Sequence, residues 1–229
     1  MTFFAELKLA TAEARQALLL SPVIVDCLAR RVDIETYRAF LVQAYHHVRH
    51  TVPLLMACGS RLPTRLSWLQ PYLVDYINEE QGHEQWISND IEATGADAKA
   101  LLAAGPNLAT EFMVSYAYDT VQRGNPVGFF GMVQVLEGTS VALATHTAEI
   151  IRQELGLPPE ALKYLTSHGC LDQKHIGTFA EIVNRCDDPH DRAAIVHCAK
   201  AFFKLYADVF ASVPRAVSTS QLDEQRTVA

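Results

Sequence analysis

The sequence predicts an all-α protein, a single-domain bundle of seven to eight helices. Apolar residues recur at helical spacing through most of the chain, and alternating apolar and polar runs joined by Asn-Gly or Asp-Gly turns are absent. Of 229 residues, 49% are hydrophobic and 20% charged, so the chain can bury one sizeable core. We therefore expect one helical domain over residues 1–214 and a polar, disordered C-terminal tail over residues 215–229.

Proline and capping residues delimit the N-terminal helices. We expect a first helix over residues 3–20 and a short helix after Pro22. Asp33 has a side chain suited to a helix N-cap, and a long helix should follow from Ile34. Pro53 should kink this helix because proline lacks the backbone N–H of a helix interior.

Later breaks delimit the remaining helices. Leu62-Pro63 ends the preceding segment, and Gly95 is the residue type favoured just after a helix C-terminus. Gly105-Pro106, Asn125-Pro126 and Pro158-Pro159 are further breaks. The expected helices are 72–94, 97–104, 109–122, 127–155, 159–185 and 189–214.

Charge and cysteine content narrow the class of partner. A formal net charge of -7 offers no basic footprint for nucleic acid or an anionic membrane. The five cysteines lack paired spacing, as expected for reduced thiols in a cytosol. The N-terminus lacks the order of a signal peptide, and no apolar run approaches the ~20 residues of a membrane span. We expect a soluble cytoplasmic protein that acts on a small molecule.

His168, Asp172 and His175 form the most informative motif of the chain. Their spacing of i, i+4 and i+7 places them along one stripe of a helix. Two imidazoles and a carboxylate suit a first-row transition metal, above all iron with positions open for oxygen. A lone histidine is more often structural, but three spaced groups of the right type favour a metal site.

Two further segments supply candidate ligands. Glu80 and His83 form a Glu-x-x-His pair, as on the helices of diiron bundles, whereas Glu79 and Glu84 beside them are interpreted as a solvated face. Glu137 lies in an otherwise apolar helix, where a carboxylate must be paired, protonated or bound to metal. With the first motif these residues give three imidazoles and three carboxylates, a set suited to two iron ions.

In order and spacing, these ligands resemble the haem-oxygenase-like diiron oxidases, relatives of thiaminase II and pyrroloquinoline-quinone synthase. The likeness spans roughly residues 30–210. It implies a seven-helix bundle that binds two Fe²⁺/Fe³⁺ ions without haem and uses O₂ to oxidise or cleave a C–C or C–N bond. The implied substrate is a small carboxylate-bearing molecule, a fatty acid or an amino acid. The implied metal ligands, with no further catalytic residue, are Glu80, His83, Glu137, His168, Asp172 and His175.

Tyr76 marks a departure from the pattern of many of these relatives. They carry the first carboxylate seven positions before the histidine, and that position here is Tyr76. The fatty-acid decarboxylases that form terminal alkenes instead use a carboxylate three positions before it, which matches Glu80 and His83. The ligand pattern is therefore closest to that of the alkene-forming enzymes.

Three other interpretations stay open. A haem oxygenase would use His46 or His50 as the proximal ligand, which leaves the three acidic candidates unexplained. A thiaminase II-like hydrolase needs an activated cysteine; on a helix Cys170 faces away from His168, and we interpret it as packing. A non-catalytic binding or regulatory protein of the same fold would bind no stoichiometric iron.

Substrate contacts are expected from Arg49, His46 and Tyr76. The planar guanidinium of Arg49 suits a carboxylate. Aromatic residues at helical spacing line either an apolar tunnel or, more simply, the core. As partners we further expect an electron donor and a second copy of the chain in a homodimer, with neither nucleic acid nor membrane.

Overall fold

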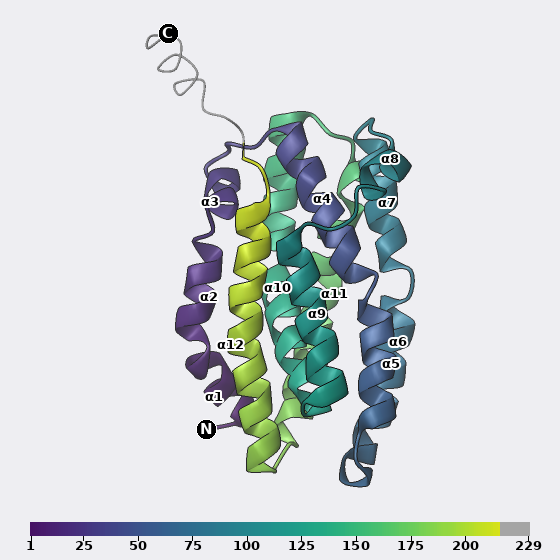
Figure 1. The fold of residues 1–229 in the computed structure, drawn as a ribbon. Helices are drawn as coiled ribbons and strands as arrows, with labels where there is room; N and C mark the ends of the chain where they lie inside the picture. The colour runs from purple at the N-terminus through teal and green to yellow at the C-terminus, as the bar shows by residue number, and fades with distance from the viewer. Residues whose placement is uncertain (216–229) are drawn as a thin grey trace.

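The described part of the chain contains helices as its only regular secondary structure (Figure 1). The structure is a computed structural model that describes residues 1–215, except for the side chains of Cys170 and Gln173. Within these residues it has twelve α-helices and three short 3-10 helices, which confirms the predicted all-α class. The tail predicted to be disordered lies outside the described residues from residue 216 onward.

The helices follow one another in this order. The first half of the chain forms α1 (Phe3–Ala10), α2 (Ala12–Leu19), α3 (Pro22–Leu28), α4 (Ile34–Val48), α5 (Thr51–Arg61), η1 (Thr64–Leu69), α6 (Gln70–Glu80) and α7 (His83–Ala93). The second half forms α8 (Ala98–Leu102), α9 (Leu108–Arg123), η2 (Pro126–Gly128), α10 (Phe129–Leu155), η3 (Pro159–Leu162), α11 (Lys163–Asn184) and α12 (Pro189–Ser212).

The described residues form twelve α-helices rather than the predicted seven to eight, in part because three expected helices are each broken in two. The segment 3–20 divides at Thr11. The helix from Ile34 ends at Val48, so the break precedes Pro53, which lies in the first turn of α5 where proline is tolerated. The segment 72–94 divides at Gly82, whose φ of 87° is a left-handed conformation that glycine adopts without strain.

The predicted helix ends at Asp33 and Gly95 are confirmed. The Asp33 side chain accepts a hydrogen bond from the backbone N–H of Thr36 at 2.7 Å, which satisfies one free donor of the first turn of α4. Gly95 follows α7 with φ 84°. Both ends are set by local chemistry, which is why short-range sequence signals located them.

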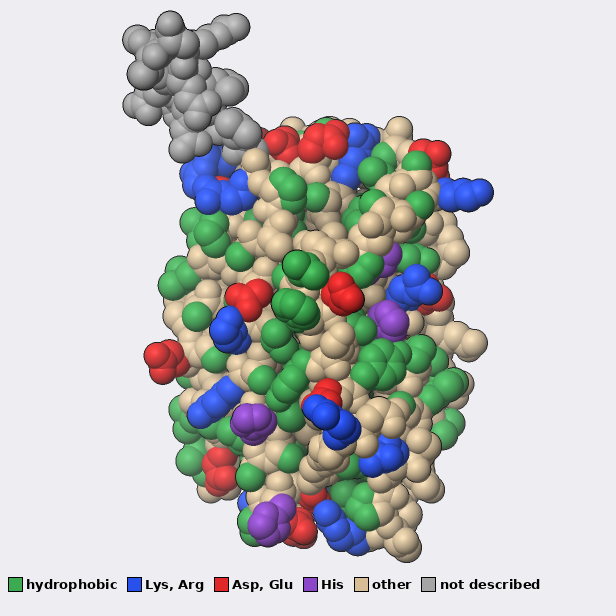
Figure 2. Space-filling view, in the orientation of Figure 1, with side chains coloured by type: hydrophobic (Ala, Val, Ile, Leu, Met, Phe, Trp, Pro, Cys, Tyr) green, Lys and Arg blue, Asp and Glu red, His purple; other side chains and the backbone are tan. Residues whose placement is uncertain are grey.

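Helix α10 is the centre of the bundle. It packs against α11 and α12, and α7 in turn packs against α4 and α11. In Figure 1, α1 to α3 lie on one side of the bundle and α4 to α8 on the other. On the face shown in Figure 2, acidic, basic and apolar side chains are interspersed. The four helices α6, α7, α10 and α11 carry the candidate ligands.

One described segment, Pro126–Leu155, is long and apolar enough to cross a membrane by length and composition alone. This differs from the expectation that no apolar run approaches that length. Within its most apolar window, 67% of the residues are buried inside the protein. That burial is what a central core helix requires, since a helix surrounded by other helices is apolar around most of its circumference.

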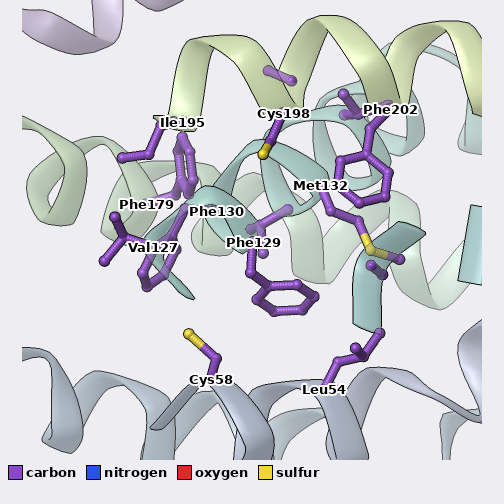
Figure 3. Close-up of a cluster of buried hydrophobic side chains, with 14 of the residues drawn as sticks. Leu54, Cys58, Val127, Phe129, Phe130, Met132, Phe179, Ile195, Cys198 and Phe202 are labelled. Carbon is purple, nitrogen blue, oxygen red and sulfur yellow. The ribbon is translucent and has the colours of Figure 1, made fainter. Parts of the chain in front are cut away.

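The main core forms where α10 lies between α5 and α12. Figure 3 shows α10 side chains extending toward both helices. Each fully buried aliphatic or aromatic side chain contributes roughly 1.5–3 kcal/mol relative to an exposed one. The labelled contributors are Leu54 and Cys58 from α5, Val127, Phe129, Phe130 and Met132 around the start of α10, Phe179 from α11, and Ile195, Cys198 and Phe202 from α12.

Two glycines allow neighbouring helices to approach α10 closely. A Cβ on Gly131 would lie 2.5 Å from the backbone nitrogen of Ala199 in α12, closer than real Cβ atoms approach. A Cβ on Gly169 would collide with the Oγ1 atom of Thr145. These contacts fix the position of α10, and therefore of Glu137, relative to α11 and α12.

Candidate metal centre

Four helices bring the six predicted ligands into one buried region. The ligands form two groups of three, and within each group the donor atoms all lie within 4.8 Å of one another. The first group is Glu80, His83 and His168, and the second is Glu137, Asp172 and His175. All six donors are oxygen or imidazole nitrogen, the set that suits a divalent first-row metal.

The first group is assembled across a helix break. Glu80 is the last residue of α6 and His83 the first of α7, so the expectation that they share a face of one continuous helix is wrong. The turn at Gly82 nevertheless brings His83 Nδ1 to 3.0 Å from Glu80 Oε2. The His83 ring stacks on Trp86 at 4.0 Å and meets His168 edge-on, with ring centroids 4.8 Å apart.

The second group depends on α11 facing α10. His175 Nδ1 lies 3.4 Å from Glu137 Oε1 and 3.5 Å from Asp172 Oδ1. The same nitrogen lies 3.7 Å from Glu80 Oε1, so the two groups adjoin. His168 Nδ1 is 3.4 Å from Asp172 Oδ1, as the i, i+4 spacing predicts.

Several donor atoms of the cluster are buried and have no hydrogen-bond partner in the described part of the chain. Glu80, Glu137 and Asp172 are 5%, 5% and 2% exposed, so three carboxylates share a region removed from water. Among described residues, Glu137 Oε2, His168 Nε2 and His175 Nδ1 lack any hydrogen-bond partner. Unsatisfied buried polar atoms cost roughly 1–3 kcal/mol each, more when charged. These residues therefore fit metal ions, which would satisfy the unpartnered atom of the first group and the two of the second.

The proton balance of the cluster favours the same interpretation. Burial raises the pKa of Glu137 to about 7. Burial opposes a proton on His175, but the neighbouring carboxylates of Asp172 and Glu137 outweigh it and raise the pKa of His175 to about 10. The metal-free cluster thus holds protons at neutral pH, and a bound cation would displace them.

Two residues outside the six hold the second group in place. The Tyr76 hydroxyl donates a hydrogen bond to Glu137 Oε1, and its ring lies 5.1 Å from that of His175. Glu79 Oε2 lies 2.8 Å from His175 Nε2, while Glu79 Oε1 pairs with Lys174 at 2.7 Å. The interpretation of Glu79 as part of a merely solvated face missed this contact, which depends on how α6 faces α11.

A largely apolar cavity of about 150 Å³ adjoins the cluster. Its polar lining includes Glu80, Glu137, His168 and Asp172, and the apolar lining comes from α3, α4, α5, α10, α11 and α12. Representative apolar lining residues are Ile24, Phe40, Leu55, Phe129, Met132, Leu136, Leu143, Ile151 and Phe210.

His47 is a cavity residue that the sequence interpretation missed. It is 2% exposed, its Nδ1 atom has no hydrogen-bond partner among described residues, and burial lowers its pKa to about 3. His47 is therefore a neutral polar group in an apolar wall. Its helical spacing from Phe40 and Ala44, which also occupy the inner side of α4, was the signal that could have placed it there.

Of the three residues predicted to contact substrate, one lines the cavity and two do not. Tyr76 lines the cavity, whereas Arg49 is exposed, with its guanidinium over the ring of Tyr45. His46 is buried but is absent from the cavity lining. His50 Nδ1 is 3.0 Å from the hydroxyl of Tyr118. The side chain of Cys170, interpreted as packing, lies outside the described residues.

The architecture and the donor set together define a helical protein of the haem-oxygenase-like class with a candidate metal centre. The chain belongs to a family described as iron-containing redox enzymes, whose sequence profile matches residues 38–207. This confirms the family suggested by the ligand pattern. Among curated proteins, none matches the chain.

Solved structures share the fold over almost the whole chain. A haem-oxygenase-like domain of unknown function from Shewanella denitrificans has a TM-score of 0.82 at 23% identity, covering 99% of this chain and 96% of that one. A TenA homologue from Pyrococcus furiosus has a TM-score of 0.72 at 14% identity, covering 91% and 98%. Haem oxygenase-1 from Synechocystis, solved with haem, has a TM-score of 0.73 at 11% identity, covering 100% and 97%. At these identities the likeness establishes the fold.

Proposed function

We propose that this protein is a non-haem diiron oxidase or oxygenase that uses O₂ to oxidise or cleave a C–C or C–N bond of a small carboxylate-bearing substrate. The observation that carries the proposal is the convergence of three buried carboxylates and three imidazoles in two adjoining groups. The iron-containing redox enzyme family supports the choice of metal. The fold alone would not decide between an enzyme and a binding protein.

In this proposal each group holds one ion. Glu80, His83 and His168 would bind the first, while Glu137, Asp172 and His175 would bind the second. When bound, iron supplies the redox chemistry with O₂ that amino-acid side chains lack. Fewer than six protein donors per ion leave positions for substrate and oxygen.

The protein's own residues orient these donors. Tyr76 occupies Glu137 Oε1 and leaves Oε2 without a partner, so one carboxylate oxygen is directed to the ion. Glu79 occupies His175 Nε2 and leaves Nδ1 facing the carboxylates. Hydrogen bonds of this kind fix the ring orientation and tautomer of a ligating histidine.

The cavity lining narrows the substrate class. It contains no lysine or arginine from the described residues, and His47 is neutral because burial lowers its pKa to about 3. A substrate carboxylate would therefore find its positive partner at the metal end, and the remainder of the molecule would lie against aliphatic and aromatic side chains. We propose an acid with an apolar chain, since the ammonium group of an amino acid would be desolvated there.

The alternative functions find less support in the described residues. A hydrolase would need a thiolate. Cys27 lines the cavity, but burial raises its pKa to about 11 and keeps it a thiol. A haem protein would use one axial histidine and would leave the three buried carboxylates without a function. A purely structural role would not explain why Glu137 and His175 have unpartnered atoms.

Anaerobic titration of the metal-free protein with Fe²⁺, followed by O₂ uptake in the presence of a reductant, tests the proposal. We expect about two equivalents of Fe²⁺ to bind. O₂ consumption should be stimulated by straight-chain fatty acids of graded length more than by amino acids. Binding of no stoichiometric iron would refute the proposal and favour a non-catalytic protein.

Four variants test the assignment of the ligands. Glu137→Ala and His175→Ala should each abolish the O₂ reaction because each removes a donor of the second group. Glu84→Ala and His146→Ala remove an acid and an imidazole outside the two groups and should leave the reaction unchanged. Full O₂ reactivity in both ligand variants would show that the site is wrongly placed.

A further inference from the structure

A second cavity of about 300 Å³ reaches the candidate metal centre from the side of α6 and α11. It shares Tyr76, Val133 and Glu137 with the apolar cavity, so these residues separate the two. His175 also lines the second cavity. The candidate centre is therefore reached by two cavities of different composition.

The lining of the second cavity is acidic where it meets solvent. Asp75, Glu79 and Glu181 contribute three carboxylates, and Lys174 contributes one ammonium group. Asp75 and Glu181 are exposed, as is Lys174, whose side chain is 72% accessible. By contrast, among the described residues that line the apolar cavity, the only carboxylates are Glu80, Glu137 and Asp172 of the candidate centre.

The inner end of the second cavity is lined by two buried residues that have unsatisfied polar atoms. Glu137 and His175 are 5% and 6% exposed, and Glu137 Oε2 and His175 Nδ1 have no hydrogen-bond partner among described residues. Glu79 connects the outer and inner parts, since it pairs with Lys174 at 2.7 Å and with His175 at 2.8 Å. The cavity thus runs from exposed acids to unsatisfied buried donors.

We propose that this second cavity is the access route for a hydrated divalent cation to the buried centre, separate from the cavity that takes the organic substrate. The inference rests on the proposed function only in that the centre binds metal. A cleft lined by charges of one sign raises the local concentration of counter-ions and their association rate. Asp75 and Glu181 attract the cation, and Lys174 opposes it. An apolar wall offers a hydrated ion no comparable attraction.

The test is the rate at which Co²⁺ binds to the metal-free full chain in anaerobic stopped-flow measurements, followed by visible absorption. The Asp75→Asn/Glu181→Gln double variant should bind Co²⁺ about three- to tenfold more slowly at low ionic strength, and salt should reduce this difference. Lys174→Gln should bind faster. Glu111→Gln on α9 removes an exposed acid that does not line the second cavity and should bind at the wild-type rate.

A pair of steric variants distinguishes the two routes. Thr178→Phe adds bulk to the second cavity, and Leu143→Phe adds it to the apolar cavity. We expect Thr178→Phe to slow Co²⁺ binding and Leu143→Phe to leave it unchanged, with the same final spectrum in both. Slower binding in Leu143→Phe alone, or wild-type rates in every variant, would overturn the proposed route while leaving the proposed function intact. If the wild-type protein binds no metal, the proposed function itself fails.

Discussion

Glu79 and His175 lie on different helices, yet the Glu79 Oε2 atom is 2.8 Å from Nε2 of His175. The hydrogen bonds of Glu79 with Lys174 and His175 lower the pKa of Glu79, so it is an ionised acceptor at neutral pH. The imidazole therefore donates from Nε2 and presents Nδ1 to Glu137 and Asp172. A residue outside the donor set thus selects the atom that faces the candidate metal.

We predict that Glu79→Ala weakens metal binding by the second group about 10- to 100-fold, because losing the carboxylate releases the orientation of the ring. Glu79→Gln retains an acceptor oxygen and should lose less. Lys174→Ala removes only an exposed ion pair and should hardly change the equilibrium affinity. Anaerobic equilibrium titration with Co²⁺ measures all three; a wild-type affinity in Glu79→Ala would refute the positioning role.

Tyr76→Phe should destabilise the metal-free protein by about 1–3 kcal/mol, because Glu137 then loses its hydrogen bond from the hydroxyl. The deficit should shrink when metal occupies Glu137. Urea unfolding with and without Co²⁺ measures both effects. Tyr72→Phe, whose hydroxyl contacts Arg185 near the surface, is the matched control and should cost little. Equal effects of the two substitutions would contradict this account.

Gly169→Ala should lower the free energy of unfolding by about 1–3 kcal/mol, since the added Cβ collides with Thr145 Oγ1. Thr145→Ala should relieve the collision, so the double variant should recover most of the loss. Gly177→Ala on the same helix places the new Cβ more than 4 Å from the atoms of the described residues that could obstruct it, and should stabilise by about 0.5–1 kcal/mol. Thermal unfolding of the four variants tests this. A Gly169→Ala loss that Thr145→Ala leaves unchanged would argue against the close approach.

The buried carboxyl group of Asp90 should make the free energy of unfolding depend on pH. It is fully buried and accepts hydrogen bonds from the backbone N–H groups of Lys163 and Tyr164 at the start of α11, and burial raises its pKa to about 7 from 3.8. Between these values the folded protein keeps the proton that the unfolded chain has lost. The contribution of Asp90 to stability is therefore complete below pH ~4 and falls as pH rises to ~7.

Asp90→Asn cannot titrate and isolates this effect. Relative to that variant, the wild-type protein should lose up to about 1.4 kcal/mol per pH unit between pH ~4 and ~7, and nothing further above pH 7. Urea unfolding at several pH values measures the difference. A difference that stays constant with pH would show that the folded-state pKa of Asp90 is ordinary. Asp90→Ala should be destabilised at every pH, because two N–H groups lose their acceptor.

The helical class could be predicted because apolar residues recur at helical spacing along most of the chain, wherever one face of a helix is buried. This spacing did not locate the breaks at Thr11 and Gly82, because the apolar pattern continues across each break although one helix ends there and another begins. The α11 motif was found because its i, i+4 and i+7 spacing is a property of one helix. Glu79 and His47 were missed because the groups around them come from other helices. The spacing of residues within one helix does not reveal how that helix is rotated against its neighbours.

Gly82 lies in the break between the two helices that carry Glu80 and His83. Were Glu80 and His83 on one unbroken helix, the pitch of the backbone would fix the separation of their side chains. Here one residue ends a helix and the other begins the next, so the non-helical backbone torsions of Gln81 and Gly82 set that separation. A residue with a Cβ would be strained at φ 87°, and the relief of that strain would turn α7 against α6. The distance between the first two donors is thus adjustable by a change at one residue that carries no donor atom.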